Sequence, residues 1–255
     1  MRDLEGTICW VVGASSGIGA AVAREMRARG ARVAVSARRA DRLTAVAEGA
    51  MLTVPADVTD APGMVQAAGR VVAELGVPDV VVAAAGQSQP MPVEHWDTEL
   101  FRRQVEVNLI GMSNTVGAAL PHLLARGSGT FAGIASLAGY RGLPGGGAYS
   151  ATKAAQLTLL EDLRVQLAPR GIHVATVSPG FVRIPLTHHH RVPMPFLIDA
   201  DAAGRAICDG LERGRTEIAF PLRMALLAKA ARFVPVRAWP HLWTAVRRGQ
   251  RPTGR

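Results

Sequence analysis

The stretch VVGASSGIGAAVAREM, residues 11–26, joins an apolar run to a helical pattern through three glycines. Gly13, Gly17 and Gly19 give the spacing G-x-x-x-G-x-G around a small polar segment, residues 14–16. Glycines permit a tight turn and let a phosphate group approach backbone N–H groups at the helix N-terminus, where the helix dipole favours anions. The pattern therefore predicts a strand, turn and helix that bind a dinucleotide pyrophosphate.

The alternation that begins at this turn continues along the chain. Short runs rich in Val, Ile and Ala are separated by longer helical patterns, and we expect strands at residues 7–12, 32–36, 51–54, 80–84, 130–134, 173–177 and 217–220. Strands that are apolar on both faces and alternate with helices are typical of a parallel sheet. The expected fold class is α/β, a single-domain Rossmann-type doubly wound sheet flanked by helices on both faces, with its ligand at the carboxyl ends of the strands.

Length and composition limit the domain organisation and the possible partners. A chain of 255 residues with 49% hydrophobic content fits one large domain. Residues 1–220 would form its dinucleotide-binding and catalytic part, and residues 221–255 a basic, apolar helical extension. Cys9 and Cys208 lie in apolar surroundings without metal-ligand spacing, and there is no room for a removable signal peptide, so we expect a cytoplasmic protein. The formal charge is +9, but arginines are scattered along the chain and no basic run is interleaved with stacking aromatics, so no nucleic-acid partner is expected.

Tyr149 and Lys153 lie four residues apart in AYSATKAA, residues 148–155, in a chain with only two tyrosines. Positions i and i+4 share one face of a helix, so the phenol and the ammonium group would point the same way. A nearby cation favours the phenolate and would lower the tyrosine pKa toward the working pH, where the tyrosine could donate and accept protons. The alternative is an exposed Tyr–Lys pair on a solvated helix.

Taken in order, these and other motifs resemble the compact, single-domain branch of the short-chain dehydrogenase/reductase superfamily over about residues 6–220. Besides the glycine turn, the matching motifs are ADVTD with Asp57, VEVNLIG with Asn108, IASLAG with Ser136, Y-x-x-x-K with Tyr149 and Lys153, and the pair Pro179 and Gly180. One departure is the AAAG at the end of the fourth expected strand, where Ala83 and Ala84 replace asparagines that the family usually places before Gly86. Those amide side chains tie neighbouring backbone segments together, so their loss would make the backbone beneath the cofactor less rigid but would not change the catalytic residues.

The resemblance implies hydride transfer between a nicotinamide and a carbonyl carbon. Tyr149 would supply the proton, and Lys153 would lower the tyrosine pKa and hold the nicotinamide ribose. Ser136 would stabilise the developing charge, and Asn108 would hold a water that links Lys153 to solvent. The alternative to these catalytic roles is that Ser136 only stabilises a turn or caps a helix and that Asn108 only stabilises a helix kink. The expected cofactor-binding residues are Gly13, Ser15, Ser16, Gly17, Ile18, Gly19, Arg38, Arg39, Asp57, Val58, Ala85, Gly86, Tyr149, Lys153, Pro179, Gly180 and Val182.

The end of the second expected strand distinguishes the two nicotinamide cofactors. An NAD site needs a carboxylate there for the ribose 2′-hydroxyl, but VAVSARRADRL, residues 33–43, has no acid at Ser36 or Ala37. Guanidinium groups suit a 2′-phosphate through charge and bidentate geometry. We therefore expect NADP(H) rather than NAD(H), with Arg38 as the primary contact and Arg39 as the secondary one. The alternative is that both arginines begin the next helix in solvent.

The segment RIPLTHHHRVPMPFLID, residues 183–199, is expected to be a mobile lid over the site. Its apolar residues Leu186, Met194, Phe196 and Leu197 favour an apolar aldehyde, ketone or acyl derivative, or the matching alcohol. No metal is expected, because consecutive histidines at 188–190 would point to alternating sides of an extended segment.

Two other functions fit the same residues: a 3-oxoacyl-carrier-protein reductase with a basic docking surface, and a non-catalytic NADP-binding regulatory protein. The four intact catalytic residues argue against the second. By resemblance, the helices carrying Asn108 and Tyr149 pack against a partner subunit, so a homodimer or homotetramer is expected.

Residues 221–255 lie beyond the region of resemblance and predict two helical stretches, broken near Pro235 and Pro240. They contain no acidic residue, and Trp239 and Trp243 are four apart. The apolar residues spaced to share one face are Met224, Leu227, Ala231 and Val234, and the basic residues are Arg223, Lys229, Arg232, Arg237, Arg247 and Arg248. This pattern is typical of a helix on an anionic bilayer, which makes peripheral membrane contact one expectation. The other is that the stripe covers the core of the enzyme or a partner subunit.

Overall fold

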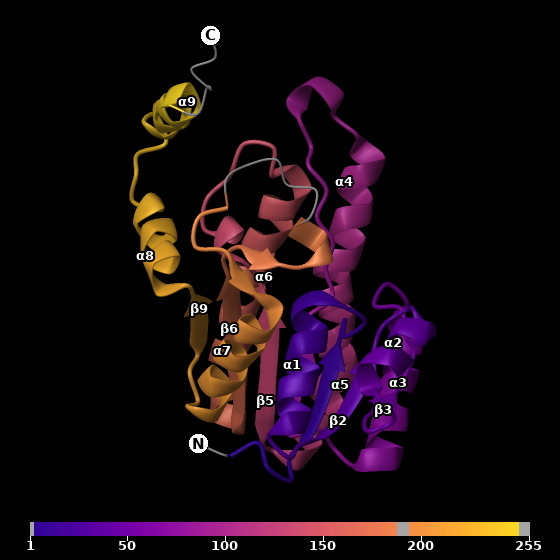
Figure 1. Cartoon of the computed structure of the whole chain (residues 1–255). Helices are drawn as coiled ribbons and strands as arrows, with labels where there is room; N and C mark the ends of the chain where they lie inside the picture. The colour runs from indigo at the N-terminus through magenta and orange to yellow at the C-terminus, as the bar shows by residue number, and fades with distance from the viewer. Residues whose placement is uncertain (1–2, 188–193, 250–255) are drawn as a thin grey trace.

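The computed structural model describes residues 3–187 and 194–249, and within these ranges one 7-stranded sheet has the order β3-β2-β1-β4-β5-β6-β9 (Figure 1). All pairings within this sheet are parallel. The strands are β1 (Ile8–Val12), β2 (Arg32–Ser36), β3 (Leu52–Thr53), β4 (Val80–Ala83), β5 (Gly129–Ile134), β6 (Ile172–Pro179) and β9 (Glu217–Phe220). The predicted doubly wound α/β fold is confirmed. Its strand order reverses between β1 and β4, the position at which such sheets bind ligands.

Helices cover both faces of the sheet and create two separate cores. One face carries α1 (Gly17–Ala28), α2 (Ala40–Ala47) and α7 (Ala200–Glu212); the other carries α3 (Ala61–Leu75), α5 (Gly111–Arg126) and α6 (Gly147–Leu167). Side chains alternate along each strand, so Cys9 and Val11 enter the first core while Trp10 and Val12 enter the second. Burial on both faces explains why the strand sequences are almost continuously apolar.

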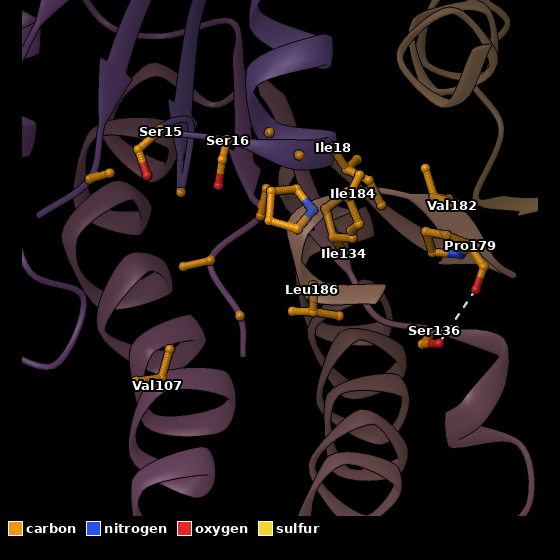
Figure 2. Close-up of a pocket in the computed structure, with 18 of the residues that line it drawn as sticks. Ser15, Ser16, Ile18, Val107, Ile134, Ser136, Pro179, Val182, Ile184 and Leu186 are labelled. Atoms are coloured by element: carbon orange, nitrogen blue, oxygen red, sulfur yellow. Dashed lines mark hydrogen bonds between the residues drawn. The ribbon is translucent and has the colours of Figure 1, made fainter. Parts of the chain in front are cut away.

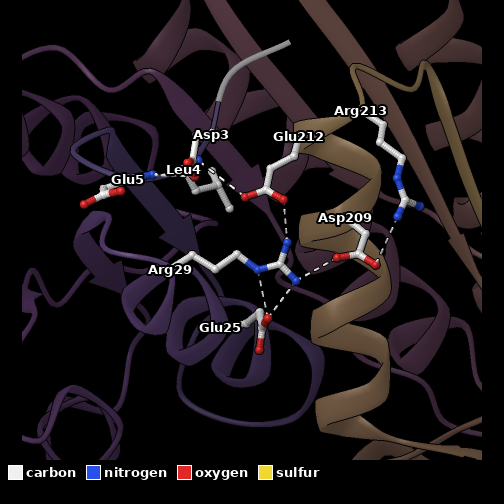
Figure 3. Close-up of polar contacts among 8 residues, drawn as sticks. All are labelled: Asp3, Leu4, Glu5, Glu25, Arg29, Asp209, Glu212 and Arg213. Atoms are coloured by element: carbon white, nitrogen blue, oxygen red, sulfur yellow. Dashed lines mark hydrogen bonds and ion pairs between the residues drawn. The ribbon is translucent and has the colours of Figure 1, made fainter.

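Close packing and a half-buried ion-pair network join α1 to α7. Gly204 allows the contact, because a Cβ there would lie 2.9 Å from the carbonyl oxygen of Ala21. Arg29, which follows α1, places Nη1 2.6 Å from Glu212 Oε2 and Nη2 2.8 Å from Asp209 Oδ1 (Figure 3). The guanidinium is only 20% exposed, so solvent screens this network less than an ordinary surface pair.

Several short elements shape the carboxyl end of the sheet. A π-helical turn, η2 (Glu106–Ile110), connects α4 (Thr98–Val105) to α5, and the 3₁₀ turn η3 (Leu137–Gly139) follows β5. Strand β7 (Val182–Arg183) pairs with β8 (Ile198–Asp199) at the base of the expected lid, whose first part forms the 3₁₀ turn η5 (Pro185–Thr187). The remaining 3₁₀ turns are η1 (Val93–His95) and η4 (Ala168–Arg170). In the described part of the chain, no helix is long and apolar enough to cross a membrane.

The C-terminal extension forms α8 (Leu222–Ala231) and α9 (Trp239–Gly249), which lie beyond β9 along one side of the molecule (Figure 1). The predicted stripe through Met224 and Leu227 does not form one covered face. Leu227 is 65% exposed, whereas Ala225 is buried against the body of the protein. Which face of this helix is covered depends on its rotation about its own axis, and the sequence spacing does not specify that rotation.

Candidate active site

A cavity of about 360 Å³ lies at the carboxyl ends of the central strands (Figure 2). In that view Ser15 and Ser16 lie on one side and Ser136 and Pro179 on the other. The predicted site residues that line the cavity are Gly13, Ser15, Ser16, Gly17, Ile18, Gly19, Arg38, Arg39, Val58, Ala85, Gly86, Ser136, Tyr149, Lys153, Pro179, Gly180 and Val182. The tertiary structure therefore brings nearly all of the predicted residues to one cavity, whereas Asp57 and Asn108 are outside its lining.

The glycine turn forms a cradle that larger residues would fill. Gly13 has φ +89°, and a Cβ there would overlap the backbone of Ala85; a Cβ on Gly19 would overlap the carbonyl oxygen of Gly13. Ser16 precedes α1 in an extended conformation, and its side chain does not cap the helix. Backbone N–H groups of the first turn can therefore bind an anion, and the cradle fits a dinucleotide pyrophosphate.

Two arginines follow β2 at one end of the cavity. Arg39 Nη2 donates a hydrogen bond to Ser15 Oγ at 3.0 Å, and Arg38 Nη1 lies 3.8 Å from Asp57 Oδ2. Ser36 is buried, and its Oγ accepts a hydrogen bond from Trp10 Nε1 at 2.9 Å. The Ser36 side chain is therefore committed to the core, and the polar groups facing the cavity at this strand end are cationic.

Asp57 takes part in its own turn rather than in the cavity wall. Its Oδ1 accepts hydrogen bonds from the backbone N and the Oγ1 of Thr59, both at 2.9 Å. The neighbouring Ala56 and Val58 line the cavity instead. The carboxylate holds the turn that presents these two side chains, so its connection to the cavity is indirect.

Asn108 is fully buried in the π-helical turn, and its side chain is occupied by protein partners. Nδ2 donates to Gln87 O and Thr152 Oγ1, both at 3.0 Å, while Oδ1 accepts from Gln87 N at 2.8 Å. Asn108 thus fixes the backbone at Gln87, just after β4. Its amide provides hydrogen bonds in a region where Ala83 and Ala84 have no amide side chains.

Gln156, which we did not predict as a site residue, connects Asn108 to Lys153. Gln156 Nε2 donates to the carbonyl oxygen of Asn108 at 2.5 Å, and Gln156 Oε1 accepts from Lys153 Nζ at 2.8 Å. The prediction that Asn108 holds a water linking Lys153 to solvent stays a prediction, and the Gln156 side chain is a direct connection between Lys153 and the Asn108 carbonyl. The available signal was spacing, because Gln156 lies one helical turn beyond Lys153, on the same face as Tyr149.

Lys153 is 4% exposed, and Nζ also donates to the carbonyl oxygen of Ile134 at 2.8 Å. Burial lowers the pKa of Lys153 from 10.5 to about 7, because removal from water disfavours the charged amine. Nζ lies 5.6 Å from the centre of the Tyr149 ring. A lysine with this pKa is only partly charged near neutral pH, so it is a weaker source of positive potential than a fully charged lysine would be.

The predicted direction of the Tyr149 pKa shift is wrong in this structure. Burial raises the pKa of Tyr149, and a hydrogen bond with Ser136 opposes that shift. The physical reason is that loss of hydration destabilises the phenolate. Ser136 itself is buried, accepts from Ala138 N at 3.1 Å and donates to Pro179 O at 3.4 Å (Figure 2). Tyr149 is therefore protonated at neutral pH and is suited to donate a proton.

The C-terminal extension holds the segment between Ser136 and Tyr149. Glu217, on the edge strand β9, accepts from Tyr140 OH and from Lys229 Nζ of α8, both at 2.5 Å. Burial opposes ionisation of Glu217, but these two hydrogen bonds lower its pKa. Burial, together with the bond to the carboxylate, raises the pKa of Tyr140 to about 12. The second tyrosine of the chain is thus a structural residue.

Further contacts join the extension to this segment. Trp239 Nε1 of α9 donates to Gly142 O at 2.9 Å, and Arg141 Nη2 donates to Val234 O at 3.1 Å. The Arg141 guanidinium also lies 5.1 Å from the Trp239 ring centre. Trp239 therefore faces the body of the protein. This contact agrees with the expectation that the extension covers the enzyme itself rather than with a membrane role for this tryptophan.

The lid is only partly described. Leu186 lines the cavity as predicted, and Ile184 reaches the glycine turn, where a Cβ on Gly17 would lie 3.5 Å from its side chain. Met194, Phe196 and Leu197 are not among the lining residues. The histidines at 188–190 lie outside the described residues, and within the described ranges no cluster of His, Cys, Asp or Glu could hold a metal. Lining residues that we did not predict are Ala37, Ala56, Ala84, Val107, Ile134, Ala135, Ile184, Pro185 and Thr187.

The chain belongs to the short chain dehydrogenase family, whose model matches residues 7–193. It is therefore an NAD(P)-dependent oxidoreductase. An uncharacterised oxidoreductase of Myxococcus xanthus is 36% identical over 241 residues, covering 92% of this chain and 95% of that protein.

Two solved structures show how closely the fold agrees. A short-chain dehydrogenase from Burkholderia cenocepacia in complex with NADP has a TM-score of 0.82 at 28% identity, covering 94% of this chain and 98% of that one. An alcohol dehydrogenase from Thermococcus sibiricus complexed with 5-hydroxy-NADP has a TM-score of 0.77 at 28% identity, covering 85% and 96%.

Proposed function

We propose that the protein is an NADP(H)-dependent reductase that interconverts an apolar carbonyl compound and its alcohol. One observation carries the proposal: Ser136, Tyr149 and Lys153 line the same cavity as the glycine turn and the arginines that follow β2. The first three are acid, base and hydrogen-bonding groups suited to carbonyl chemistry. Residues 1–220 would be the domain that binds the dinucleotide and performs the reaction, and residues 221–255 its C-terminal extension, whose helices α8 and α9 contact the segment after Ser136.

The cationic end of the cavity supports NADP(H) as the cofactor. Arg38 and Arg39 would bind the 2′-phosphate, and Ser15, which already accepts a hydrogen bond from Arg39, lies beside them. The cradle of Gly13 and Gly19 would accept the pyrophosphate. The NADP-bound neighbours in the same fold support this choice. A cofactor with a 2′-hydroxyl would offer no anionic group to Arg39 and would leave Arg38 with only its 3.8 Å pair to Asp57.

Ser136, Tyr149 and Lys153 would perform the proton chemistry. Bound NADPH supplies the hydride that reduces the carbonyl carbon. Ser136 Oγ, whose hydrogen bond to the Pro179 carbonyl is long at 3.4 Å, would turn its proton to the substrate oxygen and stabilise the charge there. Tyr149 would transfer its proton to that oxygen. Lys153, tied through Gln156 to the Asn108 carbonyl, would return a proton to Tyr149.

The walls near the reacting groups favour an apolar substrate. Val107, Ile184 and Leu186 line the cavity, and Figure 2 places Ile184 and Leu186 between the glycine turn and Ser136. A compact aliphatic or aromatic aldehyde or ketone would bury its carbon skeleton against these side chains. The exposed basic extension supports a second candidate, a reductase of acyl groups on an acidic carrier.

A screen of NADPH oxidation tests the proposal. Purified protein is assayed with apolar aldehydes, ketones and acyl thioesters, each with NADPH and with NADH. We expect turnover of free apolar carbonyl compounds with at least about a tenfold preference for NADPH in kcat/KM. Exclusive use of carrier-linked thioesters would favour the second candidate. Binding of NADPH without any turnover would refute an enzyme and favour a regulatory protein.

We propose further that the protein is a cytoplasmic homodimer or homotetramer. Ile110, the last residue of η2 before α5, and Val165 on α6 are exposed by 39% and 72%, which leaves apolar side chains in this region for a partner subunit. Light scattering at micromolar concentration tests the assembly, and a monomeric mass would refute it.

A further inference from the structure

We propose that the outer face of α8 and of the segment leading to α9 docks on an anionic lipid bilayer. We call this surface the docking face and define it by Leu222, Arg223, Leu226, Leu227, Phe233, Val236 and Arg237. The proposal concerns where the enzyme is held, so it is independent of the carbonyl substrate.

The two faces of α8 have different tasks. Ala225 is buried, the sulfur of Met224 lies against Gly180, and Lys229 pairs with Glu217, so these residues face the body of the protein. The outward side presents Arg223, Leu226 and Leu227, and the two leucines are exposed by 59% and 65%. The inner face already binds this extension to the enzyme, and the core therefore does not cover the outer one.

Exposed apolar side chains are concentrated on this extension. Twelve large hydrophobic residues of the described chain are exposed, and six of them fall between residues 222 and 242. Phe233 and Val236 are 87% and 79% exposed, the two highest values of the twelve. Single exposed apolar residues are ordinary, but a contiguous group marks an interaction surface.

The charge of the chain is concentrated in the same place. Residues 221–255 contain eight arginines and lysines and no acidic residue, while residues 1–220 hold the other 21 basic residues and all 20 acidic ones. The body of the protein is thus nearly neutral, and the extension carries almost the entire charge of +9. Arg223 and Arg237 of the docking face are exposed.

An anionic bilayer satisfies both properties of this face. Its acyl region would receive the leucines and Phe233, and its headgroups would attract the arginines. A second copy of the chain placed face to face would bring two uniformly basic segments together without an acidic residue between them. Charge complementarity therefore favours lipid over self-association as the occupant.

Sedimentation with vesicles tests the proposal. Full-length protein is mixed at low salt, about 0.05 M, with vesicles of phosphatidylcholine alone or containing about 30% phosphatidylserine. We expect it to pellet with the phosphatidylserine vesicles and to be released at about 0.5 M salt. No binding to the anionic vesicles at low salt would overturn the proposal.

Matched variants test whether vesicle binding depends on the docking face or on exposed apolar side chains in general. The pair Leu226→Ser and Phe233→Ser should weaken binding at least about tenfold, because it removes large apolar groups from the lipid contact. The control pair Val65→Ser and Val165→Ser removes side chains exposed by 57% and 72% elsewhere and should leave binding unchanged. Equal loss in both pairs would overturn the assignment to α8.

A charge pair and two further measurements complete the test. The double variant Arg223→Gln with Arg237→Gln should bind the anionic vesicles more weakly and with a smaller salt dependence. The control, Arg170→Gln with Arg205→Gln, removes two arginines elsewhere and should have little effect. Circular dichroism and turnover of a water-soluble aldehyde should be unchanged in the docking-face variants. If those variants instead change the molecular mass measured by light scattering, a second copy of the chain covers this face and the proposal is wrong. The proposal is also wrong if they abolish binding to an acidic carrier protein while binding to vesicles persists.

Discussion

Replacing Lys153 with methionine should change how the stability of the cofactor-free protein depends on pH. Burial lowers the pKa of Lys153 from 10.5 to about 7. Each pKa unit corresponds to ~1.4 kcal/mol, so a charged Lys153 destabilises the fold by about 5 kcal/mol relative to a hydrated lysine below pH 7. No carboxylate among the described residues forms an ion pair with its ammonium group, which donates hydrogen bonds to the neutral Ile134 carbonyl and to Gln156.

The sign of the effect follows from proton linkage. Between pH 7 and 10.5 the unfolded chain holds a proton on this amine that the folded chain has released, so unfolding becomes less favourable as pH rises. From pH 6 to pH 9 this contribution raises the free energy of unfolding by about 2 to 3 kcal/mol. Lys153→Met cannot titrate and should lack this contribution, and its loss of two hydrogen bonds adds a change in stability that does not depend on pH.

Urea unfolding followed by tryptophan fluorescence at pH 6, 7, 8 and 9 measures the difference between wild type and variant. Lys229→Met is the matched control, because Lys229 is the other lysine of the chain and is 42% exposed beside Glu217. The free energy of unfolding of wild type minus that of Lys153→Met should increase by about 2 to 3 kcal/mol from pH 6 to pH 9, while the same difference for the control stays constant. Parallel curves for wild type and Lys153→Met would show that the amine is hydrated and refute the reasoning.

Tyr149→Phe should lower kcat by about 10²-fold or more while the NADPH dissociation constant changes less than about twofold, as steady-state kinetics and fluorescence titration would show; equal damage to both would refute the assigned role. Arg38→Asp should abolish the preference for NADPH, measured as the ratio of kcat/KM with the two cofactors; an unchanged ratio would point to Arg39. Gln156→Leu should destabilise the protein by about 1–3 kcal/mol in urea, because the Asn108 carbonyl loses its buried donor; unaltered stability would contradict the hydrogen bond. Glu217→Gln should raise KM for the carbonyl compound more than the NADPH dissociation constant, because it loosens the segment after Ser136; the reverse order would place that segment on the cofactor side.

Local features of the sequence predicted the fold and most of the cavity lining. Strand alternation, the spacing of Gly13 and Gly19, and the four-residue interval between Tyr149 and Lys153 act over one or two turns of chain. Such patterns identify which side chains share a face, and parallel strands then bring their carboxyl ends to one edge. This is why motifs distant in the chain could be assigned to one site.

Only the tertiary structure decided the environment of those side chains. Burial depends on everything packed around a group, so the sequence could not show that Lys153 loses hydration or that the pKa of Tyr149 rises. Spacing likewise did not show that Gln156 fills the gap between Lys153 and Asn108. For α8, the sequence contains an apolar and basic helix, but the rotation that buries Ala225 and exposes Leu226 is set by contacts with β9 and with the segment after Ser136. Periodicity identifies a helix face, and only the surrounding structure determines what that face meets.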